Sequence, residues 1–126
     1  YFTNVRVMPH KNMQQYLSVD YDKILSVVAV HQQGNIERIV AEARYAAYPD
    51  GLSSEMAFLV DENYQGKGIA TFMANYLIKV ARERGIKKLV ASVLAQNTKM
   101  LTVFEKLSIK PLKRYEGDTI ELDFEL

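Results

Sequence analysis

The chain has 126 residues, of which 48% are hydrophobic and 25% charged, and its net charge is +1 at neutral pH. This length suits one domain with a single hydrophobic core, and the near balance of charges argues against a nucleic-acid-binding protein that depends on neutralising phosphates. Cysteine is absent, which excludes disulfides and thiolate metal ligands and fits a reducing, cytoplasmic location, and no apolar run is long enough to predict a membrane span.

The first half of the chain reads mainly as strands. Residues 1–20 are predicted to form an irregular or helical leading segment. The β-branched run at 24–30 predicts a strand, and a turn after it leads into a longer strand over 36–47, so the two should pair as an antiparallel hairpin. A turn signal at 48–51 precedes a third strand at 55–60.

The second half alternates helices and strands. An apolar-periodic segment at 69–80 predicts a helix, residues 89–94 predict a central strand, and Asn97 is suited to cap a second helix. The chain should end in a second hairpin, and the acidic residues of its last strand (Glu121, Asp123 and Glu125) are expected on the solvated face of an edge strand. This order predicts an α+β fold with one mixed, mainly antiparallel sheet flanked by helices.

The most informative segment is the glycine loop at 65–70, between the third strand and the first predicted helix. A helix that begins this way presents free backbone N–H groups and the positive end of its dipole, which predicts a phosphate site. A Walker loop does not fit, because Lys67 is followed by Gly68, and a dinucleotide fingerprint does not fit, because Thr71 stands where a small residue is needed. A turn with only a structural role is the other interpretation.

The spacing Gln65-x-x-Gly68-x-Ala70, together with the element order and Asn97, resembles the acyl-CoA signature of the GNAT acyltransferases over roughly residues 19–126. The segments at 19–22, 43–45 and 55–58 are similar to those of the bacterial protein lysine acetyltransferase (Pat) subgroup. The resemblance implies a single GNAT-like acyl-CoA-binding domain over 1–126. Since the sequence begins with Tyr1 rather than Met, we expect that it could be a piece of a longer protein.

The resemblance also implies the site residues. The strand at 55–60 should splay from the strand at 89–94, and pantetheine should lie in the gap. The diphosphate should be held by backbone N–H groups of the glycine loop and the helix start. The implied cofactor-binding residues are Phe58, Leu59, Val60, Gln65, Gly66, Lys67, Gly68, Ile69, Ala70, Thr71, Asn97 and Phe104.

Three departures from the family pattern stand out. The usual first strand and helix are expected to be missing. Phe104 lies where the family often has a tyrosine that serves as general acid, and Ser108–Ile109 replaces a common Gly-Phe pair. The first departure concerns the acceptor side of the site, the second the general acid, and the third only a turn.

Amide formation from a thioester needs a neutral amine, and a free lysine has a pKa of about 10.4, so a base is required. Glu55 is the candidate base, because it opens an otherwise apolar strand where burial would raise its pKa, and the resemblance implies a glutamate at this position. A solvated carboxylate at a strand start is the other interpretation. A backbone N–H near Phe58 or Leu59 should stabilise the oxyanion.

We therefore expect an N-acetyltransferase that moves an acetyl group from acetyl-CoA to an amine by direct attack. The resemblance implies a protein lysine as acceptor, with acyl-CoA synthetases among the targets. A small-molecule amine acetyltransferase and a non-catalytic acyl-CoA-sensing module are the alternatives. His10 and His31 are isolated, so no metal site is predicted.

Overall fold

The computed structural model describes residues 5–9 and 24–126. Of the leading segment predicted over 1–20, only residues 5–9 are described, and they form a strand, β1 (Val5–Pro9). Since β1 pairs antiparallel with the next strand, the expectation that a first strand is missing is wrong for the strand. The short run alternates too weakly to predict it, and its pairing partner lies about twenty residues away in the sequence.

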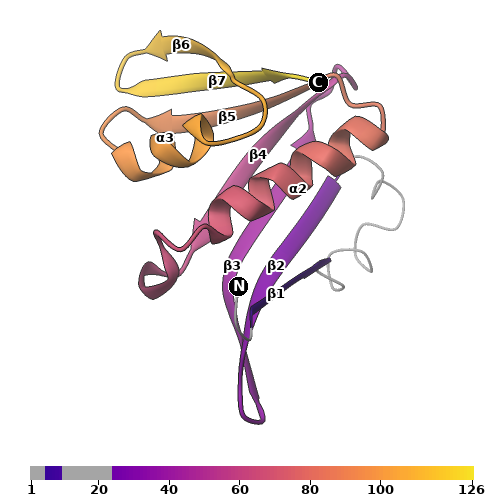
Figure 1. Cartoon of the computed structure of the whole chain (residues 1–126). Coiled ribbons are helices and arrows are strands. Elements are labelled where there is room, and N and C mark those ends of the chain that lie inside the picture. Colours follow the sequence, from indigo (N-terminus) through magenta and orange to yellow (C-terminus); the bar gives the residue numbers. More distant parts are fainter. Residues whose placement is uncertain (1–4, 10–23) are drawn as a thin grey trace.

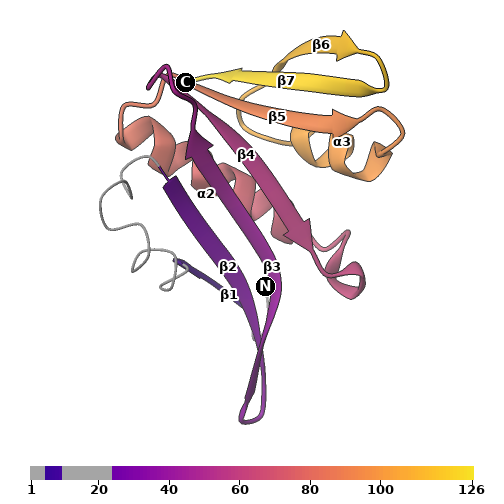
Figure 2. The same ribbon diagram turned by 180° about the vertical axis from the view of Figure 1, so that it is seen from behind.

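The described strands form one seven-stranded sheet in the order β1-β2-β3-β4-β5-β7-β6 (Figures 1 and 2). Every neighbouring pair is antiparallel except β4 and β5, which are parallel. This confirms the predicted mixed, mainly antiparallel α+β fold and both hairpins. The remaining bounds are β2 (Ile24–Gln33), β3 (Ile36–Ala47), β4 (Ser53–Val60), β5 (Lys88–Leu94), β6 (Leu112–Glu116) and β7 (Thr119–Glu125).

The two α-helices formed by residues 24–126 are α2 (Ile69–Glu83) and α3 (Thr98–Glu105). They lie on the same face of the sheet, in front of it in Figure 1 and behind it in Figure 2. A single 3-10 turn, η1 (Glu62–Tyr64), lies in the loop before α2. None of the helices formed by the described residues is long and apolar enough to cross a bilayer.

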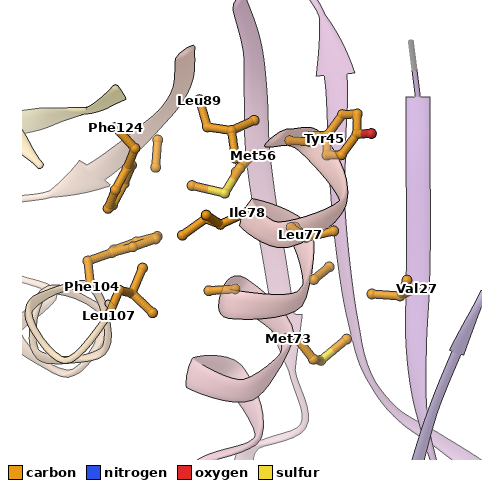
Figure 3. Close-up of a cluster of buried hydrophobic side chains, with 14 of the residues drawn as sticks. Val27, Tyr45, Met56, Met73, Leu77, Ile78, Leu89, Phe104, Leu107 and Phe124 are labelled. Carbon is orange, nitrogen blue, oxygen red and sulfur yellow. The ribbon is translucent and has the colours of Figure 1, made fainter. Parts of the chain in front are cut away.

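The hydrophobic core lies between these helices and the sheet (Figure 3). Met73 and Leu77 of α2 are fully buried and contribute to it, as the apolar period of this segment predicts. Figure 3 also shows Phe104 and Leu107, from α3 and the turn after it, pointing toward Phe124 of β7. Because the core occupies this face, side chains that alternate outward from β4, β5 and β7 gather on the opposite face.

Candidate active site

The sheet opens between β4 and β5. Only three residue pairs join them, from Ser53 with Lys88 to Glu55 with Val90. Beyond that point β4 stays paired with β3, and β5 stays paired with β7, so the two strands diverge (Figures 1 and 2). We call the diverging parts, Met56–Val60 and Ala91–Leu94, the β4–β5 split; it is the splay that the resemblance predicts.

The hydrogen bonds at both ends of the β3–β4 pairing show which backbone groups face the split. Tyr48 N donates to Ser53 O at 2.9 Å, and Asp61 N donates to Val40 O at 2.8 Å. Bonded and non-bonded pairs alternate along an antiparallel ladder. The odd-numbered residues of β4 therefore bond to β3, and the even-numbered ones direct their N–H and C=O groups away from β3, toward the split.

Phe58 and Val60 consequently present backbone groups to the split, where the predicted contacts with pantetheine would lie. Leu59 does not, because its N–H and C=O point to β3, so its expected backbone contact with a cofactor is wrong. Its side chain is 73% exposed on the face opposite the helices. Of the two predicted oxyanion donors, only the Phe58 N–H faces the split. The Val60 carbonyl already accepts from Gln65 Nε2 at 3.2 Å.

The glycine loop leads from the split into α2 with an open helix end. Gly66 and Gly68 have φ values of 78° and 86°, which favour glycine. Gly68 is the N-cap of α2 and has no side chain to cap it, and the first helical bond runs from Phe72 N to Gly68 O at 3.0 Å. The N–H groups of Ile69–Thr71 precede that bond and point out of the helix, as the predicted phosphate site requires.

The second helix at the split, α3, begins differently. The Asn97 side chain accepts a hydrogen bond from Met100 N at 3.1 Å, which confirms it as the helix cap. The Asn97 side-chain oxygen therefore bonds to the helix backbone, and the predicted cofactor contact would have to use the side-chain NH₂ group.

Phe104 lies beneath the split on the helix face. It is 2% exposed, and its ring centroid is 5.6 Å from those of both Phe58 and Phe124. It can therefore border a cofactor only as part of an apolar floor. It carries no hydroxyl that could act as the general acid.

Glu55 lies where the last β4–β5 pair forms, at the closed end of the split. Its neighbour Met56 points into the core, so Glu55 points to the opposite face, where it is exposed. The expected partial desolvation is therefore wrong. The cross-strand partner of Glu55 is Ala46, whose small side chain does not cover the carboxylate.

The turn before β4 is held by Asp50. Its carboxylate accepts hydrogen bonds from Leu52 N (2.9 Å), Ser53 N (3.0 Å) and the Ser53 hydroxyl (2.6 Å). These bonds, that from the Ser53 hydroxyl first, hold the pKa of Asp50 below its usual value. They hold the turn that leads into β4, two residues before Glu55.

Acidic side chains of β7 share the face of Glu55. Asp123 lies beside Val90, the cross-strand partner of Glu55, and pairs with Arg114 of β6 at 3.1 Å. Asp123 is only 9% exposed, and β7 lies between β5 and β6, so the expected solvated edge strand is wrong. The sequence could not exclude it, because only the order of strands in the sheet makes β7 internal.

These observations can be set against known proteins. The profile described as the Acetyltransferase (GNAT) family matches residues 6–108. The chain belongs to the GNAT acetyltransferase family. The GNAT chain is 32% identical over 108 residues to Acetyltransferase Pat of Mycolicibacterium smegmatis, covering 84% of this chain and 32% of that protein. It therefore spans about a third of that relative's length.

Solved structures agree with the GNAT fold. The GNAT domain of S. lividans PAT superimposes with a TM-score of 0.71 at 28% identity, covering 94% of this chain and 70% of that one. A GNAT family acetyltransferase from Elizabethkingia anophelis with acetyl-CoA bound superimposes with a TM-score of 0.68 at 19% identity, covering 98% and 99% of the two chains. The second likeness shows the fold alone.

Tyr48 of this GNAT domain, which the sequence did not single out as a site residue, is influenced by the charge of the candidate base Glu55. Burial raises the pKa of the Tyr48 hydroxyl, the carboxylates of Glu55, Glu121 and Asp123 raise it further, and Arg114 lowers it. The hydroxyl therefore stays protonated at neutral pH. Tyr48 follows the last residue of β3, and its N–H donates to Ser53 O, two residues before Glu55, so the β3–β4 pairing brings it to this end of β4.

No group of three or more histidine, aspartate or glutamate side chains that could hold a metal occurs within residues 5–9 and 24–126.

Proposed function

We propose that this domain transfers an acetyl group from acetyl-CoA to an amine, and that the amine is a protein lysine side chain. The observation that carries the proposal is the β4–β5 split, which leads directly to the uncapped start of α2. Unpaired strand backbone suits the amide groups of pantetheine, and an open helix N-terminus suits a diphosphate. A ligand in which pantetheine joins an acyl thioester to a diphosphate would occupy both the split and the start of α2.

The cofactor contacts follow from this arrangement. Backbone N–H groups from Gln65 to Thr71 would hold the diphosphate, and the backbone of Phe58 and Val60 would pair with pantetheine. The thioester would then lie toward the closed end of the split, near Glu55. The Phe58 N–H is the proposed donor to the carbonyl oxygen as it becomes an oxyanion.

In the proposed reaction Glu55 accepts a proton from the incoming ammonium, directly or through water, because only the neutral amine has a free electron pair. The amine nitrogen attacks the thioester carbon, and the C–S bond breaks once the C–N bond has formed. The thiolate is a good leaving group, so the reaction does not require a general acid at the position of Phe104. The proton lost by the attacking nitrogen balances the charge of the departing thiolate.

Two observations favour a protein lysine as acceptor. The first is the likeness to proteins named Pat. The resemblance to the Pat subgroup in the sequence analysis implies a protein lysine as acceptor, and acyl-CoA synthetases are the target class that we propose. The second is that Glu121 of β7 lies on the same face of the sheet as Glu55, where two carboxylates would attract a cationic amine. A cytoplasmic reaction fits the lack of cysteine.

A non-catalytic acyl-CoA sensor is the second candidate, favoured by the lack of a hydroxyl at Phe104. Acetyl transfer to lysine peptides, measured beside calorimetric binding of acetyl-CoA, separates the two. Glu55→Gln should lower kcat/KM at neutral pH by about 10²–10⁴ with cofactor affinity unchanged. Glu83→Gln, an exposed acid at the end of α2, is the matched control and should keep full activity.

An unaltered pH–rate profile in Glu55→Gln would remove Glu55 from the mechanism. Binding of acetyl-CoA by the unaltered domain without turnover on any amine would favour the sensor. Mass spectrometry of modified proteins, with and without the active domain, would identify the acceptor.

A further inference from the structure

The loop before α2 rests on the β2–β3 hairpin through two side-chain contacts. Arg38 of β3 pairs with Asp61 at 3.2 Å, and His31 of β2 shares a hydrogen bond between its Nδ1 atom and the Tyr64 hydroxyl. The His31 and Tyr64 rings meet edge to face, with centroids 5.4 Å apart and planes at 75°. Tyr64 is also half-buried against the hydrophobic core. The orientation of its ring is therefore held from two sides.

The other contact of Tyr64 is with Lys67. The Lys67 Nζ atom lies 5.9 Å from the centroid of the Tyr64 ring. An aromatic ring attracts a cation through its quadrupole and leaves the positive charge in place. Among the described residues no carboxylate forms an ion pair with Lys67. No ion pair among the described residues therefore cancels the charge of the Lys67 ammonium. Lys67 itself lies between Gly66 and Gly68, at the open start of α2.

We propose that the Lys67 side chain supplies a counter-charge to the diphosphate of acyl-CoA, and that Tyr64, oriented by His31, is the positioning residue that holds Lys67 there. This inference rests on the proposed function, because it requires the diphosphate at the glycine loop. The inference goes beyond the proposed function because it gives roles to the side chains of Lys67, Tyr64 and His31, whereas the proposed function uses only the backbone of the loop. A carboxylate in place of the Tyr64 ring would hold Lys67 as well but would cancel the charge that the phosphates need.

Calorimetry with coenzyme A tests the inference. Lys67→Met and Tyr64→Leu should each weaken binding by about three- to fivefold at low salt, the size expected for an exposed charge pair, and the losses should shrink at high salt. The double variant should be no weaker than Lys67→Met alone, because Tyr64 acts through Lys67. Tyr64→Phe keeps the ring and its edge-to-face contact with His31, which is the contact that orients it, and should stay within about twofold of the unaltered domain.

Lys79→Met, at an exposed lysine near the other end of α2, is the matched control and should bind normally. Thermal unfolding of each variant separates lost folding from lost binding. Additive losses in the double variant, losses that do not depend on salt, or a Tyr64→Phe variant as weak as Tyr64→Leu would overturn the positioning role.

A second ligand identifies the phosphate. Coenzyme A that lacks its 3′-phosphate should show the same loss in Lys67→Met, since the diphosphate remains. A loss confined to intact coenzyme A would overturn the diphosphate assignment. No binding to the unaltered domain would overturn the proposed function, whereas normal binding with unaffected variants would overturn this inference alone.

Discussion

The two helices that begin at the open end of the β4–β5 split begin in opposite ways. Because β4 and β5 are parallel, α2 and α3 both start where the strands diverge. The first turn of α3 is capped by Asn97, whereas the N-cap of α2 is Gly68, which has no side chain to offer. A helix that caps itself has less to offer an anion, while an uncapped one keeps its N–H groups for a ligand. The missing cap therefore supports the proposed phosphate site more specifically than the presence of a helix end does.

The largest expected effect comes from closing the open helix start. Gly68→Val should weaken coenzyme A binding by about 100-fold or more, because the side chain would displace a phosphate held by charge-assisted hydrogen bonds of about 1.5–3 kcal/mol each. Gly85→Val is the matched control: Gly85 has a similar φ of 81° but lies at the other end of α2. Both variants should lose stability, and calorimetry should show lost affinity only for Gly68→Val. Equal loss in both would attribute the effect to backbone strain.

A smaller effect is expected at the capped helix. Asn97→Ala should lower the free energy of unfolding by about 1 kcal/mol, the usual cost of losing an N-cap. Asn97→Asp keeps an acceptor for Met100 N but loses the amide nitrogen, so it should retain stability while binding acyl-CoA a few times more weakly. Chemical denaturation and calorimetry on both variants separate the two roles. If Asn97→Asp binds normally, the predicted cofactor contact of Asn97 is wrong.

The smallest effect concerns the side chain that spans the start of the glycine loop. Gln65→Ala removes the hydrogen bond to the Val60 carbonyl and should weaken acyl-CoA binding by about threefold, in line with a net hydrogen-bond value of about 0.5–1.5 kcal/mol. Gln96→Ala, an exposed glutamine in the turn before α3, should leave affinity unchanged. An equal loss of acyl-CoA affinity in Gln96→Ala would show that the loss in Gln65→Ala does not come from the hydrogen bond to Val60.

Much of the fold could be predicted because its signals are local. The apolar period of α2, the capping residue of α3 and the alternation in β7 each lie within one stretch of chain, and all three elements are confirmed. Strand β1 could not be predicted, because a strand of five residues depends on its partner rather than on its own pattern.

The candidate site also has some features that neighbouring residues predict and others that depend on distant elements. The glycines at 66 and 68 and the open start of α2 follow from neighbouring residues, so the loop was predictable. The exposure of Glu55 was not, because it depends on a residue from another strand, Ala46, which lies beside Glu55. For the same reason the choice of Phe58 over Leu59 required the β3–β4 register.

By itself the sequence determined where the elements from β2 onward form and that one helix starts at an uncapped glycine, since these depend on contacts within a few residues. Only the tertiary structure decided that β4 and β5 part after three pairs, which face Glu55 occupies, and that β7 is internal. The reason is physical: strand order and register arise from pairing between segments far apart in the chain, and a shift of one residue moves every side chain to the other face.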